Sequence, residues 1–380
     1  MKYGAHRKKI VSYLKVYHNN LSSLAYLIFL RLHLIAGLIK KAKKFKLVHL
    51  PLKFFIFQVI HLATLVLLNM KKILLLELMM AACTGLNAQI MFKTEYFGES
   101  DYRMTEGDTD RKVGNSKGSA VVYQGGVNIP LSMKLDENKR PTMWALSVGG
   151  AYVRLDNKGF TEPLVIDEIM NLGLSLNHLR PLNDRWSMLA TVGGGIYMPS
   201  TKLSKIRFKN VLGSVGVVFI YHLKPNLELG GGIVLNNSFG YPMLFPAFYL
   251  NWATAGKYTV KISMMDGVEM SAGYNANRHL SLNIVAEMKG QMALMVQDGK
   301  DKIFSHQYII AGFRPEIKLG KRISIPLTAG IHVIRPAEIT DRSLKSMFRD
   351  RSCYFQVSPY ASAPMVIASV SIVSFSLFFS

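Results

Sequence analysis

Apolar and polar side chains alternate along much of the chain after residue 90. The stretch 320–333 shows the pattern, with Ile323, Ile325, Leu327, Ala329, Ile331 and Val333 on one face and Ser324, Pro326, Thr328, Gly330 and His332 on the other. In 279–287, Leu280, Leu282, Ile284 and Ala286 oppose Ser281, Asn283 and Glu287. A period of two places successive side chains on opposite faces of a β-strand. The pattern therefore predicts strands with one apolar and one polar face.

The alternation predicts fourteen strands, with twelve as the fallback, because 258–264 and 267–274 are shorter than the ~9–11 residues that a spanning strand needs and Asp266-Gly267 could be a bulge instead of a hairpin. The fourteen are 91–97, 118–131, 143–154, 167–179, 185–197, 210–223, 227–236, 243–251, 258–264, 267–274, 279–287, 306–318, 322–334 and 352–363. Long predicted connections (98–117, 155–166, 198–209, 288–305, 335–351) alternate with short ones (132–142, 180–184, 224–226, 319–321). This alternation is typical of an outer-membrane meander. We therefore expect an all-β, antiparallel, up-and-down transmembrane β-barrel over residues 89–363.

A soluble β-sandwich is the alternative, because its strands also alternate, with the apolar face inward. Aromatic side chains near the predicted strand ends favour the membrane barrel, since Trp and Tyr suit the membrane interface. They are Trp186, Tyr197, Tyr221, Tyr241, Phe245, Tyr249, Trp252 and Tyr258.

Residues 70–89, MKKILLLELMMAACTGLNAQ, have the layout of a secretory signal peptide. Two lysines precede an apolar core, and small or polar residues follow it. The core is shorter than the roughly twenty residues of a membrane helix. We expect a signal peptide at 70–88, cleaved between Ala88 and Gln89. A lipoprotein signal processed at Cys83 is the alternative.

The preceding residues, 1–69, contain twelve Lys or Arg and no Asp or Glu. The absence of acids argues against a folded domain with a mixed-charge surface. We interpret this basic, apolar extension as translated upstream sequence, with an inner-membrane anchor or a basic nucleic-acid arm as alternatives. Without residues 1–88 the formal charge falls from +22 to +9, which removes the main support for nucleic-acid binding.

Two stretches, FPAFYLNWATAGKYTVKISM (245–264) and YFQVSPYASA (354–363), resemble an outer-membrane β-barrel family of unknown function that is typical of Bacteroidota. The resemblance covers about residues 89–363 and implies no catalytic residue. The tail 364–380 departs from it, because barrel proteins usually end in a strand closed by an aromatic residue. Either the last strand extends into this tail, or the tail replaces the usual ending.

Candidate chemistry is sparse. Glycine clusters at 149–150, 193–195 and 230–232 lack the Lys-Ser or Lys-Thr of a phosphate loop, so we interpret them as close-packed strand positions. His306 and His332 fall near a predicted barrel mouth without an evident third metal ligand, which favours polar rim residues over a metal site. The loop 198–209 carries Lys202, Lys205, Arg207 and Lys209 without an acid, which makes it a candidate for contact with lipid phosphates, with a solvated loop as the alternative.

Glu287 is expected on the lumen face, and the acid-rich segment 98–117 is expected to be a loop. No grouping of nucleophile, base and orienting residue is evident, so we expect no enzyme, cofactor or metal. The expected partners are outer-membrane lipid and lipopolysaccharide, the barrel-assembly machinery and an unidentified small solute. The sequence thus favours a narrow channel or small-solute binding protein in the outer membrane. An adhesive barrel, or less readily an outer-leaflet lipid-modifying enzyme, is the alternative.

Overall fold

The computed structural model describes residues 88–368, apart from 138–139, 265–266, 321–322 and 349–350. The chain divides into two compact units, residues 1–77 and 78–380, and the described residues belong to the second. The predicted extension (1–69), the signal peptide up to residue 87 with Cys83, and residues 369–380 lie outside the described residues. Within the described part of the chain, no helix is long and apolar enough to cross a membrane.

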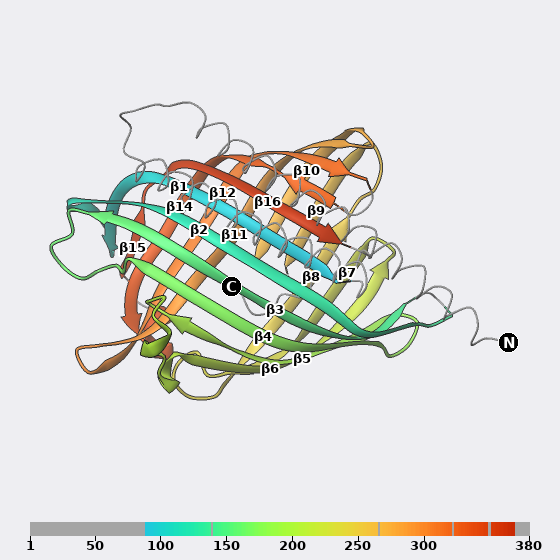
Figure 1. Ribbon diagram of the computed structural model, residues 1–380, viewed down its shortest axis with the longest axis horizontal. Helices are drawn as coiled ribbons and strands as arrows, with labels where there is room; N and C mark the ends of the chain where they lie inside the picture. The colour runs from blue at the N-terminus through green and yellow to red at the C-terminus, as the bar shows by residue number, and fades with distance from the viewer. Residues whose placement is uncertain (1–87, 138–139, 265–266, 321–322, 349–350, 369–380) are drawn as a thin grey trace, which may run out of the picture. The chain divides into compact units, whose positions relative to one another are not determined.

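The described strands form one closed antiparallel barrel (Figure 1). They are β1 (Gln89–Glu106), β2 (Thr109–Leu135), β3 (Pro141–Lys158), β4 (Glu168–Pro181), β5 (Trp186–Met198), β6 (Val211–Lys224), β7 (Leu227–Asn236), β8 (Met243–Ala253), β9 (Tyr258–Met264), β10 (Val268–Asn277), β11 (Leu280–Gln297), β12 (Lys300–Leu319), β13 (Ile323–Pro326), β14 (Thr328–Asp341), β15 (Arg351–Phe355) and β16 (Ser358–Ala368). Each strand from β1 to β12 pairs with the next, and β1 closes the ring by pairing with β15 and β16.

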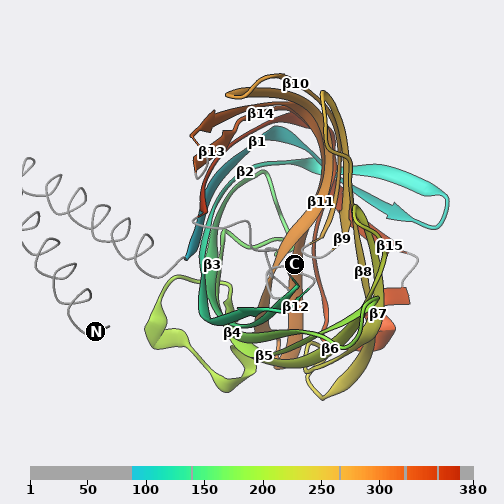
Figure 2. The same ribbon diagram turned by 90° about the vertical axis from the view of Figure 1, so that its right-hand side faces the viewer.

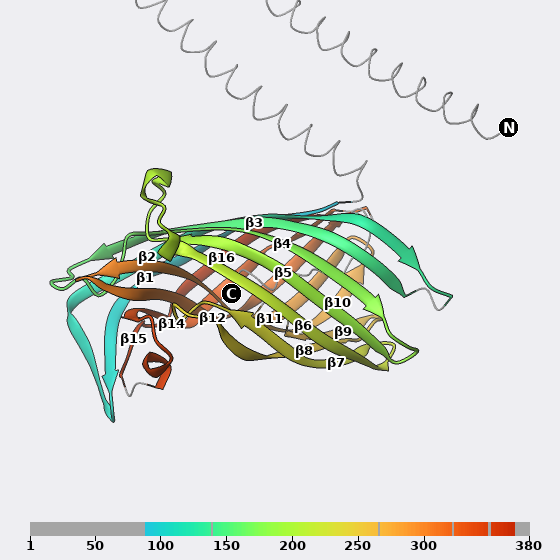
Figure 3. The ribbon, with the colours of Figure 1, turned by 90° about the horizontal axis from the view of Figure 1, so that it is seen from below.

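In the described part of the chain, three short 3-10 helices occupy two of the connections: η1 (Leu203–Lys205), η2 (Phe208–Asn210) and η3 (Leu344–Phe348). Figure 3 shows them at one end of the barrel, which we call the loop end. The opposite end carries the start of β1 at Gln89 and is called the terminal end. Connections at the terminal end are short, as in the two-residue link between β6 and β7.

The number of strands differs from the prediction: the described residues form sixteen where fourteen were expected. The difference arises because two of the predicted strands are each divided, at Leu327 between β13 and β14 and at 356–357 between β15 and β16. Pro326 lies beside the first break and Pro359 close to the second. Proline has no backbone N–H, so the hydrogen-bond ladder is weakened at these positions.

The predicted long loops 98–117 and 288–305 are wrong, because both regions are strand hairpins. β1 and β2 are joined at residues 107–108, and β11 and β12 turn at Asp298-Gly299. Asp298 and Gly299 both have positive φ (52° and 73°), as a tight hairpin turn requires. Three acidic residues of the first hairpin, Glu99, Asp101 and Asp110, form ion pairs with bases, as Asp101 does with Lys112 at 3.0 Å. Opposite charges on facing strands stabilise the outer face of this hairpin, while Tyr102 and Met104 on its inner face are buried in an apolar cluster.

The apolar face of the strands points outward. On β11, Ile284 is 69% exposed whereas Glu287 is 4% exposed, and on β14, Ile331 is 45% exposed whereas His332 is fully buried. This arrangement is the reverse of a soluble sandwich, in which the apolar face would be covered. The structure confirms that the strands have one apolar and one polar face, and it shows that the polar face lines the interior.

Aromatic side chains gather outside the barrel near its terminal end. Trp186 lies 5.0 Å from Tyr221 between ring centroids, and Tyr258 lies 5.5 Å from Tyr274. Trp144 stacks on His178 at 4.1 Å. The prediction is wrong for Tyr197 and Tyr249, which point inward and are 4% and 6% exposed.

Glycines allow neighbouring strands to approach closely, as predicted from their clusters. A Cβ on Gly150 would lie 2.6 Å from the carbonyl oxygen of Asn171, and one on Gly232 would overlap the backbone of Val217. The position at Gly231 is open, because a Cβ there would meet no atom within 4 Å. The interpretation as close-packed positions therefore holds for Gly150 and Gly232 and is wrong for Gly231.

β11 has a neighbouring strand on both sides for only part of its length, because the β9–β10 hairpin beside it is short. The pairing of β8 with β9 begins at Leu250, and that of β11 with β10 ends at Met288. Beyond Met288, β11 runs through the interior of the ring and contacts β4 and β5 on the opposite wall (Figure 2). This crossing divides the interior at the loop end.

Asparagine side chains bond to the free edge of β11 at this crossing. The Asn210 amide nitrogen donates to the carbonyl oxygen of Leu294 at 2.5 Å. With its amide turned to satisfy both atoms, Asn171 donates to the carbonyl oxygen of Met292 at 2.8 Å. A sheet edge left without partners is costly when buried, and these two side chains supply hydrogen bonds that a neighbouring strand would otherwise make.

Candidate functional site

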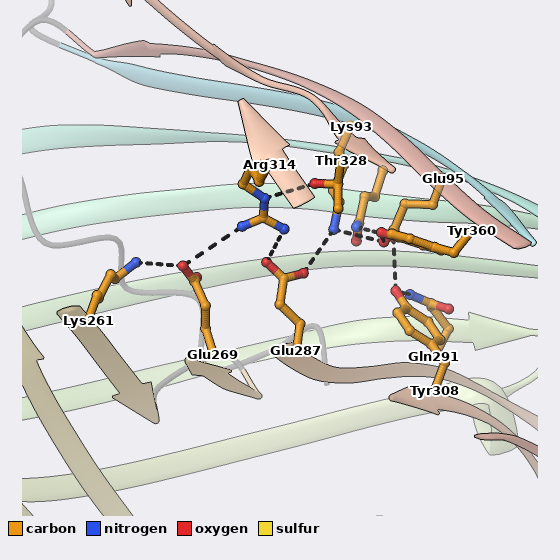
Figure 4. Close-up of polar contacts among 11 residues, drawn as sticks. Lys93, Glu95, Lys261, Glu269, Glu287, Gln291, Tyr308, Arg314, Thr328 and Tyr360 are labelled. Atoms are coloured by element: carbon orange, nitrogen blue, oxygen red, sulfur yellow. Dashed lines mark hydrogen bonds and ion pairs between the residues drawn. The ribbon is translucent and has the colours of Figure 1, made fainter. Parts of the chain in front are cut away.

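A chain of ion pairs crosses the barrel interior and is the main concentration of buried charge. We call it the ion-pair ladder, and its members are Lys261 (β9), Glu269 (β10), Arg314 (β12), Glu287 (β11), Lys93 (β1) and Glu95 (β1). Figure 4 shows the side chains converging from these strands. Three cations face three carboxylates, so the ladder is electrically balanced.

The centre of the ladder is tightly bonded and dry. Arg314 Nη2 lies 2.5 Å from Glu287 Oε1, and Lys93 Nζ lies 3.4 Å from Glu287 Oε2. The Glu287 side chain is 3% exposed. Because β16, β14 and β12 lie between β1 and β11 in the sheet, the Lys93–Glu287 pair spans the interior in front of these three strands. It therefore narrows the lumen at this level.

Glu95 ends the ladder with an unusually complete set of donors. Its carboxylate accepts hydrogen bonds from Tyr360 (2.6 Å), Gln124 (2.7 Å) and Tyr308 (2.9 Å), and Lys93 Nζ lies 2.7 Å from it. Charge-assisted bonds of this kind offset the cost of burying a carboxylate. These contacts hold strands β1, β2, β12 and β16 together around one side chain.

The other end of the ladder borders a cavity of about 640 Å³ at the terminal end, which we call the vestibule. Its charged lining residues are Lys261, Glu269, Arg314, Glu316 and Lys318. Lys318 donates to Ser281 at 2.7 Å, and Ser281 donates to Asn275 at 2.6 Å. The vestibule thus presents both charges and several hydrogen-bonding groups to a solute.

Apolar clusters fill much of the remaining interior. One cluster joins Phe97, Phe304 and Phe355 towards the loop end, and the loop after β3 adds Phe160 to it. A second cluster includes Leu189, Val218 and Tyr249 on the β3–β8 side. Packing of this kind leaves no room for a wide pore.

Some of the predicted site residues lie elsewhere. Lys202, Lys205, Arg207 and Lys209 lie together in the loop-end connection 199–210, with Lys209 bonded to Asp301 at 2.7 Å. His306 and His332 are fully buried, so their interpretation as rim residues is wrong. The part of the chain that the structure describes contains no group of three or more His, Cys, Asp or Glu suited to a metal.

Sequence reasoning placed Glu287 on the lumen face, and the structure confirms it. It missed Lys93, Glu95 and Arg314. A signal was available for the first two, because FKTEYF (92–97) carries charges two positions apart in an otherwise apolar strand. Side chains two positions apart point to the same face of a strand, so both charges lie on one face.

Ala88 is buried, and β1 begins at Gln89. The expected cleavage point therefore coincides with the start of the barrel, although the cleavage itself stays a prediction.

Comparison with known proteins gives one family. The profile described as "Domain of unknown function (DUF6268)" matches residues 84–367. No curated protein matches the chain.

Several solved barrels are similar in structure. The translocator domain of the autotransporter NalP from Neisseria meningitidis has 12% identity and a TM-score of 0.31, with 80% of this chain and 97% of that chain covered. An outer membrane channel from Pseudomonas putida F1 has 12% identity and a TM-score of 0.36, with 74% and 94% covered. A mutant of the TodX monoaromatic hydrocarbon channel has 10% identity and a TM-score of 0.33, with 74% and 90% covered. Likenesses this distant leave the function to be argued from this chain's own geometry.

Proposed function

Because this chain belongs to the DUF6268 family, a domain of unknown function matching residues 84–367, we propose a role from its own residues. It is an outer-membrane β-barrel that binds a small polar solute in the vestibule. The expectation of a family of unknown function is thereby met, while its assignment to Bacteroidota stays a prediction. No catalytic role is part of the proposal.

The exterior supports the membrane location. Exposed side chains such as Leu244 (64%), Phe248 (71%) and Ile284 (69%) would face water at a high cost in a soluble protein. In a bilayer they face hydrocarbon, and the aromatic groups at the terminal end meet the interface. Short connections mark the periplasmic side of such barrels, so the terminal end and its vestibule face the periplasm.

Tryptophan fluorescence tests this placement. The three tryptophans, Trp144, Trp186 and Trp252, lie on β3, β5 and β8 near the terminal end. In vesicles with brominated lipids, we expect stronger quenching from bromine close to the headgroup than from bromine at the end of the acyl chain. Quenching by aqueous iodide alone would contradict the membrane placement.

One observation carries the solute-binding proposal: a polar vestibule ends at an ion-paired constriction. Lys261 has a half-exposed side chain (46%) and Glu269 is less exposed (24%), so both remain accessible from the cavity. The deeper pair, Arg314 and Glu287, is 11% and 3% exposed. A solute carrying both charges is complementary to this lining, which is why we favour a zwitterion.

A ligand titration tests the proposal. Free amino acids serve as zwitterionic probes and neutral sugars as the comparison, and bound ligand raises the unfolding midpoint by mass action. We expect an amino acid to stabilise the protein and Lys261→Ala to weaken its binding about tenfold, equivalent to ~1.4 kcal/mol. Lys300→Ala, at the loop-end turn between β11 and β12, is the control and should bind normally.

Planar-bilayer recording separates this role from that of an open channel. The ion-pair ladder and the apolar clusters predict little steady conductance. A large steady conductance, together with no stabilisation by either class of probe, would overturn the solute-binding proposal in favour of a pore.

The outer loops suggest partners for the opposite side of the membrane. Lys202, Lys205 and Arg207 are exposed, and no ion pair involves them within the described ranges. They support contact with lipopolysaccharide phosphates through Coulomb attraction. Insertion by the barrel-assembly machinery follows from the proposed location.

A further inference from the structure

Three basic side chains are buried together on the loop-end side of the ladder. They are His306 on β12 and His332 and Arg335 on β14, and each is 0% exposed. The ring of Phe97 lies 5.9 Å from the His306 ring, 5.8 Å from the His332 ring and 5.7 Å from the guanidinium carbon of Arg335. The three groups therefore surround one aromatic side chain.

Arg335 has too few hydrogen-bond partners for a buried guanidinium. Its Nη2 donates to the carbonyl oxygen of Gly118 at 2.7 Å. Nε and Nη1 are buried and have no partner within the described residues. No carboxylate there forms an ion pair with this side chain, in contrast to Arg314, which contacts both Glu287 and Glu269.

Aromatic packing does not replace the missing acceptors. The guanidinium carbon lies 4.0 Å from the centroid of the Phe355 ring, so this ring interacts with the cation through its face. The N–H groups of arginine lie in the plane of the guanidinium and need acceptors in that plane. Ring contact therefore stabilises part of the charge and leaves the donors at Nε and Nη1 unsatisfied.

His306 supplies a second unpartnered polar atom. Its Nδ1 lies 3.2 Å from Gln291 Oε1, while its buried Nε2 has no partner in the described structure. His332 differs, because Nε2 lies 2.6 Å from the Gln356 carbonyl oxygen and Nδ1 lies 3.0 Å from Ser358 Oγ. Because Gln291 Nε2 donates to Tyr308, Gln291 Oε1 accepts from His306 Nδ1, and the free Nε2 of neutral His306 is an acceptor. Within the cluster, Arg335 is therefore the member with unsatisfied donors.

A buried charge without compensation is strongly destabilising, and buried donors without acceptors add to the cost. We propose that a small inorganic anion, of the size and charge of chloride, occupies this site and is bound by Arg335. The anion neutralises the guanidinium and accepts hydrogen bonds from Nε and Nη1. Its small size follows from the enclosure by Phe97, Tyr308 and Phe355, which are all fully buried.

This anion site is independent of the solute proposed for the vestibule. Arg335 and His306 do not line the vestibule, and the ladder carries its own balanced charges. The two proposals can therefore fail separately.

Halide replacement tests the site directly. Crystals of the full chain grown in bromide should show an anomalous scattering peak within hydrogen-bonding distance of Arg335 Nε or Nη1. Density for water alone at this position, without an anomalous peak, would overturn the proposal. This measurement does not depend on the folding of any variant.

Thermal unfolding gives a second readout. At constant ionic strength, with gluconate as the bulky replacement anion, the midpoint should rise with the logarithm of the chloride concentration. Arg335→Met should abolish this dependence. Arg342→Met is the matched control, because Arg342 donates to the carbonyl oxygens of Asn237, Ser238 and Lys209, and it should keep the chloride dependence. An equal chloride effect in wild type and Arg335→Met would contradict the proposal.

Discussion

Replacing Glu287 by glutamine should lower the free energy of unfolding by about 3–5 kcal/mol, the usual cost of removing one partner from a buried ion pair. Glu287 is 4% exposed and contacts both Arg314 and Lys93. The substitution keeps the shape of the side chain but leaves two buried cations without their shared carboxylate. Urea unfolding, followed by the heat-sensitive gel mobility of the barrel, would measure the loss.

Glu269→Gln is the control for this experiment. Glu269 also contacts Arg314, at 3.9 Å, but its side chain is 24% exposed and its pairing partner Lys261 is 46% exposed. Solvent screens such pairs, so the expected cost is at most about 1 kcal/mol. Equal losses for Glu287→Gln and Glu269→Gln would show that the centre of the ladder is not a dry, structural constriction.

The double variant Asn171→Ala, Asn210→Ala should release β11 from the opposite wall. Each amide bonds to a carbonyl oxygen on the free edge of β11, at Met292 and Leu294. Loss of a partner for a buried polar group costs about 1–3 kcal/mol, so we expect a total near the upper end of that range or above it. Hydrogen exchange of residues 291–297 should increase more than that of β12.

Asn157→Ala is the matched control, because Asn157 also donates to a carbonyl oxygen, that of Ile166, at 2.8 Å. That bond joins the end of β3 to the loop that follows it and does not involve β11. The control should leave exchange in 291–297 unchanged. If both variants changed it equally, the two asparagines would have no particular role in holding β11.

Strand pairing beyond the predicted strand ends shows one limit of the sequence prediction. Segments 98–117 and 288–305 were expected to be loops because they are charged or irregular in pattern, but they extend β1, β2, β11 and β12. In both segments the inward face is apolar and buried, as at Tyr102, Leu294 and Phe304, and charged pairs such as Asp101–Lys112 lie on the outer face of the first. A search for strands with an apolar outer face and a polar inner face therefore misses them.

The ladder shows a second limit. Lys93 and Glu287 are 194 residues apart in the chain, and only closure of the barrel brings their strands to face each other. Alternation placed Glu287 on a polar face and would have placed Lys93 and Glu95 on one as well. It contains no information about which polar faces meet across the lumen.

The sequence by itself determined most of the strands and their two faces, because a period of two is imposed locally by strand geometry. The tertiary structure decided which face is outside, how far the strands extend and where β11 crosses the interior. It also decided which buried charges are paired, as at Glu287, and which are not, as at Arg335. These properties depend on contacts between distant strands, which local periodicity cannot specify.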